Sequence, residues 1–70
     1  MRRTELLRKI AKQAKAAELP WILVRQGGGH EVWACGSTKV TIPRHTEVVE
    51  YTAQAICKQL EKELGKGWWR

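Results

Sequence analysis

Apolar residues recur at three- and four-residue spacing near the start of the chain, which predicts an amphipathic helix over residues 4–18. The apolar positions of this helix are Leu6, Leu7, Ile10, Ala14 and Ala17. Thr4 is expected to cap the helix start, because a hydroxyl can accept a hydrogen bond from a free backbone N–H. Pro20 disfavours helical geometry at Leu19, so we expect the helix to stop near Glu18.

Three short segments rich in alternating or β-branched residues follow, and they predict strands over residues 21–26, 30–35 and 39–43. The second strand alternates, so that one of its sides carries Glu31, Trp33 and Cys35. In the third strand, the residues expected to face the core are Val40 and Ile42. Gly36 and Ser37 suit a two-residue type II′ turn, which needs glycine first. Two tight connections predict an antiparallel meander.

The last predicted element is a helix that ends near Leu64, with an apolar stripe formed by Ala53, Ile56, Cys57, Leu60 and Leu64. Thr46 and Thr52 can each cap its start. Thr52 precedes the clearest periodicity, so we expect the helix to start there and residues 47–51 to form a loop. The element order predicts one α+β domain over residues 1–70, an αβββα fold with both helices on one face of a three-stranded antiparallel sheet. Its core is expected within residues 4–64, and a tail rich in glycine and tryptophan follows over residues 65–70.

Charge and cysteine content narrow the class of protein. The chain has 13 Lys and Arg against 7 acidic residues, all glutamate, which gives a net charge of +6. A basic chain without a signal peptide or a long apolar run is expected to be cytoplasmic, with an anionic partner such as nucleic acid and no membrane partner. Cys35 and Cys57 are too few for a disulfide scaffold and lack the spacing of metal ligands, so we expect no metal and no cofactor.

The best candidate for chemistry is His30, which follows a run of three glycines where a turn leads into a strand. Glycine allows a phosphate to approach the backbone closely, and the pKa of histidine suits proton transfer near neutral pH. RNA carries its own nucleophile, the 2′-hydroxyl, so cleavage without a metal needs only a base, an acid and cations. Cleavage with two metals needs clustered carboxylates, which the sequence does not offer. The residues therefore favour metal-free cleavage of RNA.

Three short patterns follow one another along the chain. They are Trp21-x-Leu23-Val24-Arg25-Gln26-x-Gly28-x-His30, Val40-Thr41-Ile42-Pro43-Arg44-His45 and Thr52-x-x-x-Ile56-x-Lys58-Gln59. In this order and spacing they resemble the HicA toxin family, over about residues 6–64. HicA toxins are small mRNA interferases of type II toxin–antitoxin systems, with a fold like that of double-stranded-RNA-binding domains. The resemblance implies an endoribonuclease toxin of the stress response that acts on mRNA. It also implies a HicB-like antitoxin as the partner of this chain. The chain itself would contact DNA only indirectly, through that antitoxin.

The resemblance maps the family's active histidine onto His30, as general acid and base. The family has a Gly-Ser pair before this histidine, whereas here Gly29 stands at the serine position and offers no hydroxyl. Arg25 and Arg44 are expected to flank the same edge of the sheet, which makes them the best candidates to bind a phosphate. The other candidates for contact with RNA are Gly28, Gly29, Lys39 and His45.

Two other functions remain open. A non-catalytic RNA-binding module of the same fold would read the shape of A-form RNA and would not need His30. A small protein-interaction subunit would use Trp68 and Trp69, which either form a partner interface or fold back as a lid on the seam between helices and sheet. Trp21 is expected to belong to the core. Trp33 could stack on a base, but we favour packing against the sheet.

Overall fold

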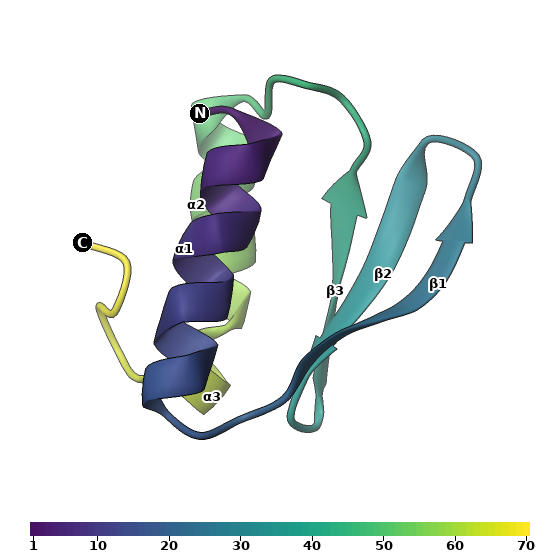
Figure 1. Ribbon diagram of the computed structural model, residues 1–70. Coiled ribbons are helices and arrows are strands. Elements are labelled where there is room, and N and C mark those ends of the chain that lie inside the picture. The colour runs from purple at the N-terminus through teal and green to yellow at the C-terminus, as the bar shows by residue number, and fades with distance from the viewer.

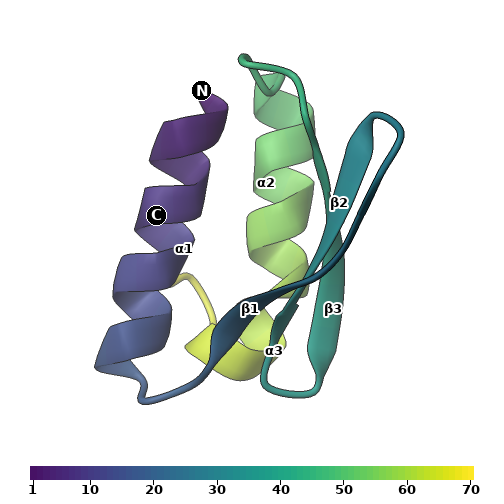
Figure 2. The same cartoon turned by 45° about the vertical axis from the view of Figure 1, so that its right-hand side comes forward.

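The computed structural model describes all 70 residues. Its elements are α1 (Arg3–Ala16), β1 (Trp21–Gly27), β2 (His30–Cys35), β3 (Thr38–Pro43), α2 (Glu50–Gln59) and α3 (Glu61–Leu64). The helices lie on one side of a three-stranded antiparallel sheet (Figures 1 and 2). The predicted α+β class and αβββα order are confirmed, except that the last helix is divided at Leu60 into α2 and α3.

The core lies between the helices and the inner face of the sheet. Its buried residues are Leu6, Ile10, Ala14, Cys35, Val40, Ile42, Val48, Ala53, Ile56, Cys57, Leu60 and Leu64. All five apolar positions predicted for the last helix belong to this cluster, which confirms that stripe. Val40 and Ile42 face inward as expected, because the pleat of β3 turns every second side chain toward the helices.

The start of α1 differs from the prediction, because no side chain caps it. Arg2 takes the N-cap position that we expected for Thr4. The N–H of Arg3 instead donates to the carbonyl of Thr46, at 2.9 Å. The loop after β3 therefore supplies the acceptor that a threonine hydroxyl would have given.

The end of α1 is formed by a backbone motif. Glu18 has a φ of 58°, in the left-handed region. Its N–H donates to the carbonyl of Lys15, and the N–H of Leu19 donates to the carbonyl of Ala14. These two bonds define a Schellman motif, which satisfies carbonyls that the helix end would leave free. The helix thus stops near the predicted residue, at Ala16.

The central strand β2 is joined to both neighbours by two-residue turns. Cys35 pairs with Thr38 across Gly36 and Ser37, and only the glycine of this turn has a positive φ, 58°. This geometry confirms the predicted type II′ turn. Gly27 pairs with His30 across residues 28–29, where Gly28 has a φ of 54°.

The edge strand β1 is the least covered part of the sheet. Its large apolar residues Ile22, Leu23 and Val24 are 56%, 40% and 47% exposed. At its turn, the hairpin formed by β1 and β2 is directed away from the helices (Figure 2). At its other end, the rings of Trp21 and Trp33 stack with their centroids 4.8 Å apart and pack against the core, as expected for both residues.

The start of α2 corrects the sequence prediction. The helix begins at Glu50 and not after Thr52, and Val49 is its N-cap. The N–H of Ala53 donates to the carbonyl of Val49 at 3.0 Å, so Thr52 lies inside the helix. Val48 is 1% exposed and its N–H donates to the carbonyl of Met1, which holds the preceding segment against α1. Tertiary contacts, and not a side-chain cap, set this boundary.

Candidate functional site

His30 lies on the outer face of the sheet, at the end of the β1–β2 hairpin. Its side chain is exposed, and it lines an open depression of about 390 Å³. The lining residues are Arg25, Gln26, Gly27, His30, Val32 and Thr41. None of them is acidic. A Cβ built on Gly27, Gly28 or Gly29 would meet nothing within 4 Å, so the backbone beside His30 is open to a ligand.

Arg25 reaches this depression because of an irregularity in β1. The pairing with β2 shifts between Leu23 and Arg25, so that Leu23 lies opposite Trp33 on the inner face and Arg25 lies opposite Val32 on the outer face. Strict alternation would put both residues on the same face. The β-bulge at Val24 therefore redirects the arginine toward His30, as bulges beside functional sites often do.

Arg44 is separated from the depression. Its N–H donates to the carbonyl of Gly29 at 2.9 Å, next to the turn. Its side chain points the other way, with Nε 3.9 Å from Oε2 of Glu31. Arg25 and Arg44 thus lie at the same end of the sheet, but the structure does not bring them together around His30.

The remaining candidates for RNA contact are spread along the chain. His45 is exposed in the loop after β3 and does not line the depression. Lys39 is exposed opposite Ala34, toward the other end of β3. Gly28 and Gly29 form the turn that precedes His30. The structure therefore groups His30 with Arg25 and the glycine turn.

Glu31 is a residue that the sequence did not single out. It is 6% exposed on the inner face, and its carboxylate accepts hydrogen bonds from Nε1 of Trp33 at 3.0 Å and Nε2 of Gln26 at 3.3 Å. The Arg3 guanidinium also binds it, and Nε of Arg3 donates to the carbonyl of Pro43 at 3.0 Å. The Trp33 hydrogen bond is the main cause that lowers the pKa of Glu31. A lone glutamate on the side of the strand shared with Trp33 and Cys35 was the only signal for this role.

Trp68 and Trp69 fold back onto the helices, on the side away from the sheet (Figure 1). The Trp68 indole N–H donates to the carbonyl of Cys57 at 3.0 Å. The Trp69 indole N–H donates to Oε2 of Glu61 at 2.8 Å, and Nζ of Lys9 donates to the Trp69 carbonyl at 2.7 Å. The tail is therefore part of the helical layer. Of the two alternatives that the sequence left open, it does not form a lid over the seam between helices and sheet, and a role in a partner interface stays a prediction.

The two cysteines are structural. Both are buried and unpaired, and burial raises the pKa of the Cys35 and Cys57 thiols. A raised thiol pKa disfavours the thiolate, which is the reactive form. No three His, Cys, Asp or Glu side chains gather closely enough to hold a metal ion. None of the helices has the length and apolar character needed to span a membrane.

Comparisons with known proteins give no match from which a function could be assigned. No family model matches the chain, and no curated protein or solved structure matches it. The function therefore has to be argued from the depression at His30, the charge of the chain and the fold.

Proposed function

We propose that this chain is an endoribonuclease of the toxin type, which cleaves mRNA without a metal ion at the outer face of its sheet. The observation that carries the proposal is the depression that His30 and Arg25 line together. It joins a proton-transfer group to a cation that can bind a phosphate in bidentate fashion. The net charge of +6 and the sequence resemblance to HicA toxins point to the same substrate.

The chemistry requires few groups. A neutral His30 would accept the proton of a ribose 2′-hydroxyl while the 2′-oxygen attacks the neighbouring phosphorus. Arg25 would stabilise the extra negative charge on the phosphoryl oxygens. The bond from phosphorus to the 5′-oxygen then breaks, and that oxygen takes a proton from water or from the imidazolium. The products are a 2′,3′-cyclic phosphate and a 5′-hydroxyl.

The surroundings of His30 support this use. The glycine turn leaves room for the sugar-phosphate backbone. Glu31, the neighbouring residue, points to the inner face, where Arg3 and Arg44 compensate its charge. No carboxylate lines the depression, so nothing there repels a phosphate or supplies the ligands of a two-metal nuclease site.

A cleavage assay in the presence of a chelator tests the proposal. Purified protein is incubated with a long unstructured RNA and EDTA, and the ends of the products are identified. We expect cyclic or 3′-phosphate ends, and a loss of about 10²–10⁴-fold in rate for His30→Ala. His45→Ala is the matched control, because this second histidine lies outside the depression.

Three outcomes would contradict the proposal. Products with 5′-phosphate ends, or a strict need for magnesium, would indicate another mechanism. Cleavage by a folded His30→Ala protein at the normal rate would remove His30 from the chemistry. Binding of RNA without any cleavage by the wild-type chain would favour the RNA-binding module instead.

An antitoxin partner belongs to the same proposal. The edge strand β1 exposes Ile22, Leu23 and Val24 directly before Arg25. An acidic antitoxin that adds a strand to this edge would bury these residues and cover His30. Protection of the β1 amides from hydrogen exchange in a complex with a co-encoded acidic protein would support it, and protection confined to the helices would contradict it.

A further inference from the structure

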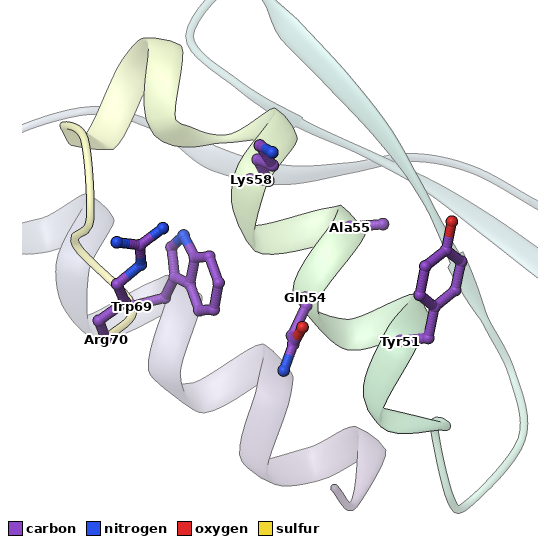
Figure 3. Close-up of a pocket in the computed structure, with 6 residues that line it drawn as sticks. All are labelled: Tyr51, Gln54, Ala55, Lys58, Trp69 and Arg70. Atoms are coloured by element: carbon purple, nitrogen blue, oxygen red, sulfur yellow. The ribbon is translucent and has the colours of Figure 1, made fainter.

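A second hollow lies on the helical layer, away from His30. It has a volume of about 360 Å³, and we call it the tail groove. Its lining residues are Tyr51, Gln54, Ala55, Lys58, Trp69 and Arg70. The four residues from α2 follow one another at helical spacing, so they form one stripe of its surface. Tyr51 and Trp69 lie at opposite ends of the groove (Figure 3).

The aromatic rings of the tail groove belong to Tyr51, which is exposed, and to Trp69, which is half-buried. Tyr51 is 84% exposed, so its ring stands in solvent. Trp69 is held in place by Glu61 at its indole N–H and by Lys9 at its carbonyl. The Arg70 guanidinium lies 5.3 Å from the Trp69 ring centroid on one side, and the ring also lines the groove. A fixed ring loses little conformational entropy when a ligand stacks on it.

Positively charged side chains lie beside these aromatic rings. Lys58 and Arg70 belong to the groove itself. A neighbouring hollow at α1 is lined by three cations, one carboxylate and the first residue of the chain, which are Arg8, Lys9, Lys12, Glu5 and Met1. Lys9 connects the two hollows through its bond to Trp69. The nearby carboxylate of Glu61 accepts hydrogen bonds from the Gly67 N–H and from the Trp69 indole N–H, and these bonds lower the pKa of Glu61. The helical layer is therefore basic beside the rings of Tyr51 and Trp69.

The depression at His30 has one cation in its lining, whereas the tail groove has two. Arg25 is the only arginine or lysine among its lining residues. One cation can position a scissile phosphate, but affinity for a nucleic acid grows with the number of phosphates that are neutralised. The affinity of the chain for RNA should then come mainly from elsewhere on its surface.

We propose that the tail groove binds single-stranded RNA, with bases stacked on Tyr51 and Trp69 and phosphates paired with Lys58 and Arg70. The inference deepens the proposed function, on which its choice of RNA rests. Unpaired bases expose faces that can stack on aromatic rings, whereas the bases of a duplex stack on one another. The substrate class is therefore an unpaired RNA segment long enough to lie on the helices while another part reaches His30.

Binding is measured by fluorescence anisotropy with a labelled single-stranded RNA of mixed sequence, in the His30→Ala background, so that cleavage does not interfere. Tyr51→Ala is expected to weaken binding by about 5- to 100-fold, because one stacking platform is lost. Lys58→Ala is expected to lower the slope of log affinity against log salt by about 0.7. Lys62→Ala is the matched control, since this exposed lysine lies outside the groove.

The Tyr51 and Lys58 side chains are exposed, so both variants should fold, and their melting temperatures verify this. Normal affinity of both variants would overturn the inference. Equal competition by a duplex RNA or by a polyglutamate peptide would also overturn it, because neither offers free bases. Cleavage by the wild-type chain is scored separately. Groove-dependent binding without cleavage keeps this inference and rejects the proposed function, and cleavage with groove-independent binding does the reverse.

Discussion

The two hairpin turns of the sheet have nearly the same backbone but different surroundings. Gly28 in the β1–β2 turn has a φ of 54°, and Gly36 in the β2–β3 turn has a φ of 58°. A Cβ on Gly36 would lie 2.5 Å from Oε1 of Glu63, whereas a Cβ on Gly28 would meet nothing within 4 Å. Glu63 also accepts hydrogen bonds from the hydroxyls of Ser37 and Thr38, at 3.0 and 2.8 Å. One turn is therefore fastened to α3, and the other extends into solvent.

This difference separates the stabilising contacts of the sheet from its candidate site. The β1–β2 hairpin is tied to the rest of the molecule near its turn through Glu31, on the inner face. Its outer face is left to His30 and Arg25. Side chains that bind ligands are commonly found on segments that packing leaves free. Substitutions in the two hairpins should accordingly change different properties.

Loss of Glu31 should have the largest effect on stability. Glu31→Ala is expected to lower the free energy of unfolding by about 2–4 kcal/mol, because a buried acceptor is removed and Arg3 and Trp33 lose their partner. Urea unfolding followed by circular dichroism measures this loss. Glu5→Ala serves as the control, since Glu5 is exposed on α1 and its substitution should change stability by less than about 0.5 kcal/mol. Equal stability of the two variants would mean that the β1–β2 hairpin is not anchored by Glu31.

The two turn glycines offer a direct comparison. Gly28→Ala should cost about 1 kcal/mol, the expense of a positive φ for a residue with a side chain. Gly36→Ala should cost about 2 kcal/mol, because Glu63 must also move away from Ser37 and Thr38. Thermal unfolding of both variants in parallel gives the difference. A larger loss for Gly28→Ala would show that the β1–β2 turn is the more constrained of the two.

Acid should weaken the anchors of both hairpins. Hydrogen bonds lower the pKa of Glu31 and of Glu63 from the usual 4.5, with Trp33 and Thr38 as the main donors. A carboxyl whose pKa is lowered in the folded state contributes stability above its unfolded pKa and loses it as the pH falls through the folded value. The free energy of unfolding should therefore decrease between about pH 5 and pH 2. Glu31→Gln should flatten this decrease, and an unchanged pH profile in that variant would contradict the role of Glu31.

The periodic spacing of apolar residues predicted the helices and strands, because burial of their apolar stripes stabilises these elements. This spacing did not predict the boundaries of elements that depend on contacts between residues distant in sequence. The start of α2 at Glu50 depends on packing of Val48 against the first residues of the chain, and no local pattern near Thr52 reveals this. The bond from Arg3 to Thr46, which replaces the cap expected of Thr4, is likewise distant in sequence.

The arrangement of the candidate site could be predicted only in part, for the same reason. The glycine run before His30 is a local signal, and the structure puts this histidine on an open surface. The bulge at Val24 leaves no mark in the sequence, such as a glycine in the strand, although it decides that Arg25 faces the depression at His30. Alternation of β2 predicted that Glu31 shares a side with Trp33 and Cys35, but only the position of the helices shows that this side is buried.

The smallest expected effect is that of Glu18→Gly. It tests the cost of a positive φ in the opposite direction, because here glycine replaces a residue with a side chain. Glu18 has the same φ as Gly36, 58°, but carries a side chain. That side chain is exposed and makes no hydrogen bond or ion pair that its removal would break. Glu18→Gly relieves a cost of about 1–2 kcal/mol in the folded state and adds about 0.5–1 kcal/mol of backbone entropy to the unfolded chain. The net expectation is a gain of about 0.5–1 kcal/mol in the free energy of unfolding, opposite in sign to Gly28→Ala.

Glu18→Ala distinguishes the two possible causes of such a gain. Alanine keeps a side chain at the positive φ, so it should leave stability within about 0.5 kcal/mol of the wild type if the backbone is responsible. A negative charge near the carboxyl end of a helix is also unfavourable, and alanine removes that charge as glycine does. If thermal unfolding finds equal gains for alanine and glycine, the charge at the end of α1 explains the effect. A gain confined to glycine means that the left-handed backbone at Glu18, and not its charge, explains the effect.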